Sequence, residues 1–326
     1  MRSVIYDAII IGAGPAGASC AVWLAYLGFS PLIIDASERV GGLSAHNPFE
    51  DAWNVTAPGL TGEEVAVQIK RSLDAARVPV LLKMRVNRVE IIEDAQQVRE
   101  LLSRHSQAEV SNCQRLFRVF FDGHALLSRF VVVASGVTPR FPQELAEKKY
   151  EHVLVGSGHH TAYYEYANKK VAVLGGGDNA FENAIYAQKR GALSVDIYAR
   201  HVRAQKKWFD SLEQKQVHTG EYLFDPQALT VNGRKYDVVL VFYGYQAQLN
   251  GLDSLGLACS EKGYVNTEVL TAETNVSGVY AIGEVSNRHH PCIVTSMADG
   301  VVAAKAIQKK LEQESAEVET ASVPSC

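Results

Sequence analysis

The chain has 326 residues, a length that fits two domains of about 100–200 residues better than one. Hydrophobic residues make up 47% of it and charged residues 21%, which is normal for a globular protein. The formal net charge of −4 gives no reason to expect nucleic acid or an anionic membrane as a partner. No apolar run approaches the ~18 residues of a membrane span, so we expect no integral membrane segment.

The first predicted element is a buried parallel strand over residues 4–11. It leads directly into a glycine turn at residues 12–17, which is unlike a signal peptide and favours a cytoplasmic protein. A helix pattern and a second strand ending in Asp35 follow. The acid comes 21 residues after Gly14, a spacing typical of a dinucleotide-binding β-turn-α-β unit. Glycines let the backbone approach a pyrophosphate, and Asp35 can accept hydrogen bonds from a ribose.

The next stretch predicts three strands with one polar interruption. Strand-like sequences occupy residues 81–91, 115–123 and 129–136. Residues 93–115 are polar and predict an exposed loop or helix. Residues 137–142 contain two prolines and predict an extended linker.

Residues 169–200 repeat the plan of the N-terminal unit. A strand leads to a glycine turn at Gly175–Gly177, and a helix and another strand follow. A single glycine motif is weak, but each of these two stands in the structural context that it requires. Two such motifs ~160 residues apart predict two nucleotide sites rather than a solenoid repeat.

The last part of the chain predicts two strands and a helix. Residues 236–246 are strand-like, and residues 279–284 predict a strand that ends in a turn at Gly283 and Glu284. A helix with small residues comes next. The tail from about residue 313 lacks apolar periodicity and is expected to be mobile.

Five cysteines are spread through the chain, namely Cys20, Cys113, Cys259, Cys292 and Cys326. No two of them have the spacing of metal ligands, so we expect no metal site. A disulfide framework is also not expected in a chain of this size without a secretion signal.

Five motifs in order, GAGPAG, ERVGGL, VVASG, GGGDNAFENA and VYAIGE, resemble the low-molecular-weight thioredoxin reductase family of FAD-dependent disulfide oxidoreductases. The resemblance extends to about residue 308. It implies an α/β fold of two Rossmann-like, three-layer dinucleotide-binding domains, one inserted into the other. The FAD domain would comprise residues 1–140 and 246–326, and the inserted domain residues 141–245. The resemblance also implies a homodimer.

The resemblance implies FAD contacts from several segments. These residues are Gly12, Ala13, Gly14, Pro15, Ala16, Asp35, Gly41, Gly42, Leu43, Asn54, Ala134, Gly136, Gly283, Glu284 and Ile293. Asn54 is a weaker match to an asparagine near the flavin ring. Glu284 replaces the family's aspartate, which binds the ribityl chain, and is one methylene longer.

The second site departs from the NADPH-binding pattern of the family. Its expected residues are Gly175, Gly176, Gly177, Asp178, Asn179, Ala180, Tyr198, Arg200 and Arg203. The basic segment after the strand is shortened, and no ribose-binding acid ends that strand. The arginines can still meet a phosphate, so NADP(H) or a second FAD is expected here. Tyr198 either stacks on an adenine or is a buried tyrosine.

The family's Cys-x-x-Cys-Asp falls on Gly158-His159-His160-Thr161-Ala162, so the usual dithiol is absent from that position. Packing of the histidines at a loop or domain interface is favoured over catalysis. The family's Arg-Gln beside the flavin falls on Pro291-Cys292. This would place a thiol near the ring, and nearby basic residues and a helix start would favour its thiolate. Filling of apolar space is the alternative.

In the fold that the resemblance implies, a bridge from Cys292 to Cys20 on the first helix is conceivable, so both are candidate catalytic residues, and Cys326 on the tail is the rival partner. The missing dithiol, the altered second site and the relocated thiol resemble the diflavin-linked disulfide oxidoreductases of oxygenic photosynthetic prokaryotes. That group implies a second FAD, and it leaves peripheral thylakoid association open.

Our leading hypothesis is therefore an FAD enzyme that exchanges electrons with a dithiol or disulfide substrate or a small redox protein. The alternatives are an NAD(P)H-dependent reductase of a carrier or quinone without thiol chemistry, and a non-catalytic flavin sensor.

Overall fold

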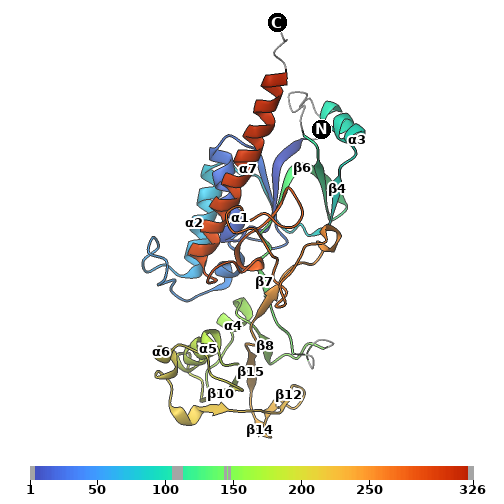
Figure 1. Ribbon diagram of the computed structural model, residues 1–326. Helices are drawn as coiled ribbons and strands as arrows, with labels where there is room; N and C mark the ends of the chain where they lie inside the picture. Colours follow the sequence, from blue (N-terminus) through green and yellow to red (C-terminus); the bar gives the residue numbers. More distant parts are fainter. Residues whose placement is uncertain (1–3, 105–112, 143–144, 146–147, 322–326) are drawn as a thin grey trace. The chain divides into compact units, whose positions relative to one another are not determined.

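The chain folds into two compact units (Figure 1). The computed structural model describes residues 4–104, 113–142, 145 and 148–321. Unit 1 comprises Met1–Val137 and Ala247–Cys326, and unit 2 comprises Thr138–Gln246. β7 (Val137–Pro139) and β16 (Tyr245–Ala247) form a two-stranded sheet. β7 lies in the segment that was expected to be an extended linker, and β16 lies at the end of the strand expected over residues 236–246.

Unit 1 is built on a sheet with the order β3-β2-β1-β6-β5-β4, in which β17 also pairs with β6. The strands are β1 (Ile5–Ile11), β2 (Pro31–Ile34), β3 (Val80–Leu81), β4 (Val86–Ile92), β5 (Leu116–Phe121), β6 (His124–Val133) and β17 (Val279–Ala281). β3, β2, β1, β6 and β17 are parallel, whereas β5 is antiparallel to both β4 and β6. Because β1 lies between β2 and β6, the loop after Ile11 leaves the middle of the parallel strands, the usual place for a ligand.

Successive residues of β1 contribute to two different cores. Ile10 packs in the core formed with α1 (Pro15–Tyr26), α2 (Gly62–Ala75) and α7 (Ile293–Ala321). Ile9 packs in the opposite core, which contains Leu255 of the short helix η4 (Asp253–Leu255). A strand that is buried on both faces explains the continuous apolar run in the sequence. The polar stretch expected as a loop or helix contains α3 (Ala95–Arg104).

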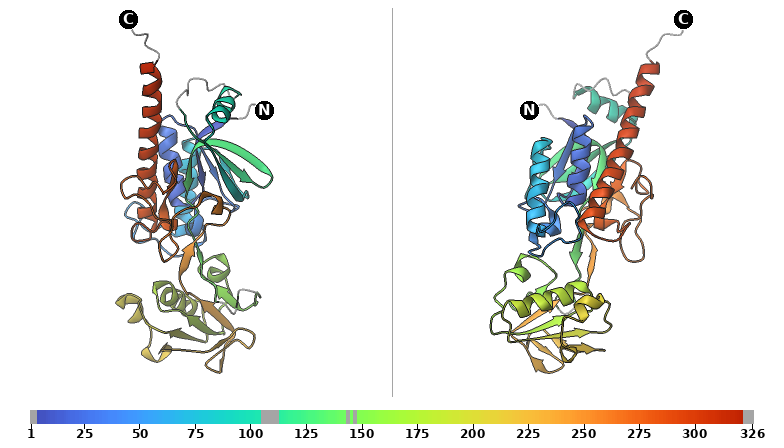
Figure 2. Two further views of the ribbon diagram at one scale, coloured as in Figure 1. Left: turned by 45° about the vertical axis from the view of Figure 1, so that its right-hand side comes forward. Right: turned by 90° about the vertical axis from the view of Figure 1, so that its left-hand side faces the viewer.

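Helices α1 and α7 lie side by side in both views of Figure 2. A Cβ atom added at Gly300 of α7 would lie 2.5 Å from the carbonyl oxygen of Ala16 and 2.7 Å from the amide nitrogen of Cys20. The Ser19 hydroxyl donates to the carbonyl of Met297 at 2.8 Å. Only a glycine at position 300 allows the two helix backbones to approach this closely.

The tail was expected to be mobile from about residue 313, and in the structure it is helical as far as Ala321, where α7 ends. Leu311 is buried, and Glu314 pairs with Arg129 of β6. Arg129 is itself nearly buried and also pairs with Asp7 at 3.2 Å. The glutamates and alanines beyond this anchor are good helix formers, so the helix persists without apolar periodicity.

Unit 2 contains a parallel sheet with the order β11-β10-β9-β15-β8. Its strands are β8 (Val153–Val155), β9 (Lys170–Leu174), β10 (Ser194–Ala199), β11 (Val217–Thr219) and β15 (Val238–Val241). One face packs against α5 (Asp178–Lys189) and α6 (Lys206–Phe209). The other packs against an antiparallel sheet of β12 (Phe224–Asp225), β13 (Thr230–Val231) and β14 (Arg234–Lys235).

The predicted α/β class is thus confirmed, with parallel sheets flanked by further layers in both units. Both glycine turns follow a central strand and precede a helix, as the sequence predicts: β1 leads to α1, and β9 leads to α5. Within the described ranges, no helix has both the length and the apolar character needed to cross a membrane.

Gly300→Ala is expected to destabilise the protein, because the added methyl group meets the backbone of α1. Overpacking typically costs about 1–3 kcal/mol, which exceeds the ~1 kcal/mol that alanine gains over glycine within a helix. Urea unfolding measures the effect. Ala298→Ser, at an exposed position of α7, is the matched control and should change stability by less than ~0.5 kcal/mol. A Gly300→Ala protein as stable as the parent would contradict the close packing of α1 and α7.

Candidate dinucleotide sites

The first glycine turn is fixed by close backbone contacts. Gly12 has a φ of +117°, and a Cβ atom there would lie 2.3 Å from the carbonyl oxygen of Ala134. A Cβ at Gly17 would lie 2.0 Å from the carbonyl oxygen of Gly12. Gly14 is the N-cap of α1, and Pro15 occupies the first turn. The free N–H groups of this helix terminus are therefore available to a pyrophosphate.

Asp35 is held against the glycine turn. Its Oδ2 accepts the N–H of Ala13 at 2.5 Å, and its Oδ1 accepts the N–H of Ser37 at 2.6 Å. An ionised carboxylate has about four acceptor positions, so it can still accept bonds from ribose hydroxyls. The structure thus brings this carboxylate to the position that the sequence spacing predicts.

The predicted Gly41–Leu43 segment lies against the same turn. The N–H of Gly41 donates to the carbonyl of Ala13 at 2.8 Å, and a Cβ at Gly42 would lie 3.1 Å from Cα of Gly14. The short helix η1 (Gly42–His46) begins here, and Leu43 is 41% exposed. An exposed leucine beside a phosphate-binding turn suits a site that an aromatic cofactor would cover.

Gly283 and Glu284 in the short helix η5 (Gly283–Val285) complete the site from the far end of the chain. A Cβ at Gly283 would lie 2.8 Å from the Cβ of Ala16. Burial raises the pKa of the Glu284 carboxyl above its ordinary value. The hydroxyl groups of a bound ribityl chain would donate hydrogen bonds to this carboxylate and so stabilise its ionised form.

Three further residues expected at the flavin, Asn54, Gly136 and Ile293, differ in burial and in their local contacts. Asn54 is buried, and its Oδ1 accepts both the N–H and the hydroxyl of Thr56, so its carbonyl oxygen serves a turn. Gly136 has a φ of +67° and accepts the N–H of Gln248 at 3.0 Å. Ile293 is half-buried and opens α7.

These residues fit FAD on observations of the structure itself. Glycines fill positions where a Cβ would collide, an acid is tethered to the phosphate turn, and an exposed leucine flanks it. The largely buried carboxyl of Glu284 follows Gly283, which contacts Ala16 of the turn. The four segments come from residues far apart in the sequence but converge after β1.

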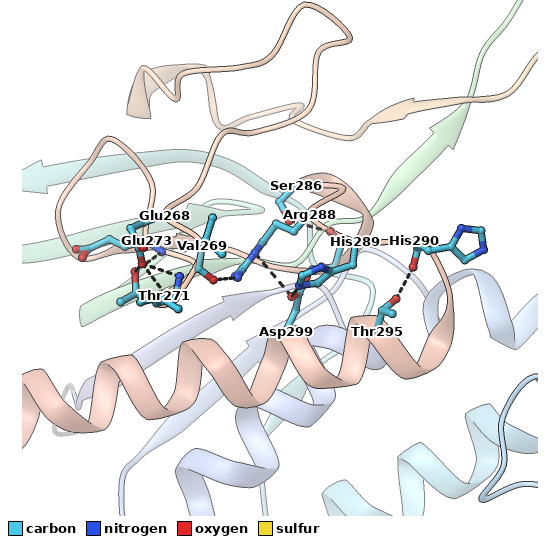
Figure 3. A network of polar contacts seen from close by, with 12 residues as sticks. Glu268, Val269, Thr271, Glu273, Ser286, Arg288, His289, His290, Thr295 and Asp299 are labelled. Atoms are coloured by element: carbon cyan, nitrogen blue, oxygen red, sulfur yellow. Dashed lines mark hydrogen bonds and ion pairs between the residues drawn. The ribbon is translucent and has the colours of Figure 1, made fainter.

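A polar network that the sequence did not reveal surrounds Asp299 (Figure 3). The buried Asp299 accepts the N–H of Gly283 at 3.1 Å through Oδ2. Its Oδ1 faces Arg288 Nε at 3.9 Å and His289 Nε2 at 3.7 Å. Arg288 donates through Nη2 to the carbonyl of Val269. Gly283, Arg288, His289 and Asp299 are among the residues that line an opening of about 10 Å³, which is room for one water.

Cys292 is the capping residue of α7. Its sulfur lies 3.4 Å from the amide nitrogen of Thr295, which donates to it, and 3.3 Å from the Thr295 hydroxyl oxygen. The N–H of Cys292 in turn donates to that hydroxyl at 3.2 Å. This reciprocal pattern is a capping box in which sulfur replaces the usual oxygen. Serine or threonine is the usual residue at such a position, so a cysteine here is unusual.

Cys292 is connected to the first dinucleotide site through Ser296, one helical turn further along α7. Its carbonyl accepts the N–H of Ser296 at 3.0 Å, and Ser296 Oγ lies 3.6 Å from a Cβ added at Gly283. Gly283 in turn contacts Ala16 of α1. The thiol therefore belongs to the segment that bounds the first dinucleotide site.

The second glycine turn repeats the geometry of the first. Gly175 has a φ of +144°, and its Cβ would lie 2.4 Å from the carbonyl oxygen of Phe242. A Cβ at Gly176 would lie 2.0 Å from the carbonyl oxygen of His201. Gly177 is the N-cap of α5, and the space where its Cβ would stand is open. The helix then continues through the predicted residues Asp178, Asn179 and Ala180.

Of the two interpretations of Tyr198, the structure supports the buried one, and stacking on an adenine is wrong for this conformation. Its side chain is almost fully buried in the core beneath β12–β14. Its hydroxyl oxygen lies 2.7 Å from that of Tyr236, and its ring stacks on His218 with centroids 4.7 Å apart. Arg200 and Arg203, by contrast, are exposed after the end of β10.

A family model described as "Pyridine nucleotide-disulphide oxidoreductase" matches residues 6–306. The chain belongs to this family. The oxidoreductase is flavin-dependent and thioredoxin reductase-like in fold.

Relatives of this oxidoreductase carry two kinds of name. A ferredoxin–NADP reductase of Limosilactobacillus reuteri is 26% identical over 315 residues, which cover 87% of this chain and 86% of that protein. A thioredoxin reductase of Vibrio cholerae is 23% identical over 336 residues, with 94% and 96% covered. The crystal structure of Lactococcus lactis thioredoxin reductase has a TM-score of 0.74 at 20% identity and covers 94% of this chain and 99% of its own. The similarity to this crystal structure shows that the two chains share a fold.

The oxidoreductase has no dithiol at positions 158–162. The four-residue helix α4 (His159–Ala162) occupies them instead. The His159 ring packs on Tyr163 with centroids 4.4 Å apart, and His160 Nε2 contacts the carbonyl of Val155 at 3.1 Å. The packing interpretation of these histidines accounts for the contacts that they make.

Cys20 and Cys292 are both free thiols in the structure, so the possible bridge between them is not formed there. Cys20 lies opposite Gly300, eight residues beyond Cys292 on α7. At 1.5 Å per residue this is about 12 Å along the helix, whereas bridged α-carbons lie within about 7 Å. Cys20 is also fully buried, and burial raises its pKa to about 12. The rival partner, Cys326, lies outside the described residues.

Iodoacetamide is therefore expected to modify Cys292 in the native oxidoreductase and to spare Cys20. Cys292 is half-buried and Cys20 is fully buried. Cys259 is exposed and serves as the internal reference for an accessible thiol. Mass spectrometry of peptides after native and denaturing alkylation gives the extent at each position. Native modification of Cys20 at the rate of Cys259 would contradict the buried position.

Proposed function

We propose that this flavin-dependent oxidoreductase exchanges electrons with a disulfide or dithiol of a small-molecule or protein substrate through Cys292. The observation that carries the proposal is the position of the Cys292 sulfur. It caps α7 one turn before Ser296, which lies against Gly283 at the first dinucleotide loop. A thiol at the start of a helix, beside a site that fits FAD, has the position of a redox-active residue.

The substrate, rather than a second cysteine of the described chain, would supply the other sulfur. Cys292 attacks a substrate disulfide, so that a bond forms between its sulfur and one substrate sulfur while the substrate's own S–S bond breaks. The other substrate sulfur leaves as a thiolate. The bound flavin, in its reduced form, would supply the two electrons that, with two protons, convert the mixed disulfide into two thiols. In the reverse order, the oxidised flavin would accept two electrons from a substrate dithiol.

Each group of the chain has a part in this exchange. Bound FAD would supply the reversible two-electron chemistry. Thr295 holds the sulfur through its N–H and its hydroxyl. Arg288 and His289, with their shared neighbour Asp299, add charge and polarity to the turn before Cys292. The glycine turn and Asp35 would fix the phosphates and the ribose.

Cys292→Ser is expected to slow reduction of the bound flavin by dithiothreitol by roughly 100-fold or more, because the nucleophile is lost. Serine is itself a good N-cap, so α7 should remain intact. Anaerobic stopped-flow absorbance at the flavin band gives the rate.

The matched control is Cys259→Ser, which removes an exposed thiol from another part of the chain and should leave the rate unchanged. Flavin reduction by dithiothreitol at the parent rate in Cys292→Ser would show that electrons do not enter at this sulfur.

A second candidate function is reduction of a one-electron carrier with NADP(H), without thiol chemistry. The observation that favours it is the retained second glycine turn together with the exposed Arg200 and Arg203 beside it, which suit the extra phosphate of NADP(H). The curated relatives named ferredoxin–NADP reductase add support. The diflavin alternative places a second FAD at the same turn, as the resemblance to the diflavin-linked enzymes suggests.

Flavin content and reaction with NADPH separate these ligands. Cofactors are released by heat, counted by absorbance and identified by chromatography, and the holoenzyme is mixed with NADPH under anaerobic conditions. Two FAD per chain with no bleaching by NADPH supports the diflavin alternative. One FAD with rapid bleaching supports NADP(H), and transfer to ferredoxin that survives in Cys292→Ser would favour the carrier function.

A further inference from the structure

The segment after β10 folds back across the second glycine turn. The N–H groups of Arg203 and Ala204 both donate to the carbonyl of Gly176, at 2.6 and 3.0 Å. A Cβ at Gly176 would lie 2.0 Å from the carbonyl oxygen of His201. The glycine is therefore needed for this crossing as well as for approach to a pyrophosphate.

A side-chain clamp holds the end of this crossing segment. Asp178, the first residue of α5, accepts the backbone N–H of Gln205 through Oδ1 at 2.7 Å. Its Oδ2 accepts the side-chain Nε2–H of the same glutamine, also at 2.7 Å. Both carboxylate oxygens thus bind one residue that is 27 positions away. Charge-assisted pairs of this kind are strong and directional.

The clamped segment is basic. It carries Arg200, His201, Arg203, Lys206 and Lys207, all of which are exposed. Two acids of α5 face this segment. Asp178 binds Gln205. Burial raises the pKa of the Glu182 carboxyl, and the nearby positive charge of Lys207 partly offsets this shift. Exposed cations on an unrestrained segment would lose conformational freedom when they bind a phosphate, and this cost weakens binding.

We propose that Asp178 and Gln205 are a positioning pair that sets the preference of the second site for a nucleotide with a 2′-phosphate. The pair fixes the backbone of residues 203–205 on the glycine turn, so that Arg200 and Arg203 are ordered before the ligand arrives. The proposal rests on NADP(H) as the ligand of this site and goes beyond it by naming the residues that arrange the arginines.

Simple electrostatics and the clamp make opposite predictions for Asp178→Ala. Removal of a negative charge beside a phosphate site would strengthen binding of an anion. Loss of the clamp would instead free the basic segment and weaken binding. Asp178→Asn separates the two effects, because an asparagine can accept the Gln205 N–H and donate to its side-chain oxygen after an amide flip.

The test is calorimetric titration of the FAD-loaded full chain with 2′,5′-ADP and, in parallel, with 5′-AMP. The parent protein should bind 2′,5′-ADP at least about tenfold more tightly than 5′-AMP. Asp178→Ala should lose about fivefold or more in affinity for 2′,5′-ADP with little change for 5′-AMP. Asp178→Asn should bind 2′,5′-ADP as tightly as the parent. Gln205→Ala keeps the backbone bond and should show a smaller loss.

Two results would overturn the proposal. One is an Asp178→Ala protein that binds 2′,5′-ADP as tightly as the parent or more tightly. The other is a parent protein that does not distinguish 2′,5′-ADP from 5′-AMP. Neither outcome bears on dithiol reduction of the flavin, so failure here is distinguishable from failure of the Cys292 chemistry. If Asp178→Ala does not fold, Gln205→Ala gives the same comparison, and undiminished binding by it would count against the clamp.

Discussion

The close approach of three backbones around Gly12 is the constraint on which unit 1 depends. α1 starts so near β1 that Gly17 faces the Gly12 carbonyl, and Gly12 itself faces the carbonyl of Ala134 at the end of β6. Gly300 then lets α7 pack against α1. Because α7 is held here, its first turn, with Cys292 as cap, lies beside the loop that fits FAD.

The chain has both glycine turns but no cysteine at residues 158–162, where the resemblance to thioredoxin reductases places their dithiol. Without that dithiol, the usual route for electrons to sulfur is absent. In the function that we propose, the thiol of Cys292, which caps α7, would provide a different route. In unit 2, we propose that the bonds between Asp178 and Gln205 would likewise offset the shortening of the basic segment by holding it in place.

Local patterns in the sequence predicted the features that local geometry controls. The glycine turns and Asp35 follow from spacing alone, because a strand, a turn and a helix need those residues at those positions. The burial of Tyr198, the level of Cys20 along α1 and the anchoring of the tail by Arg129 depend on how distant segments pack, and the sequence does not encode those distances in a short motif. Asp299 was missed for the same reason, since an acid in a small-residue helix gives no local signal of its contact with Gly283.

The central claim is that the Cys292 sulfur stands beside the reactive ring of the bound flavin. A crystal structure of the FAD-loaded protein tests it most directly through the distance from Cys292 Sγ to the isoalloxazine. We predict van der Waals contact, about 4 Å, with the sulfur still at the N-cap of α7. A flavin ring bound elsewhere, with this sulfur more than about 8 Å away, would contradict the account, because direct exchange between the two requires contact.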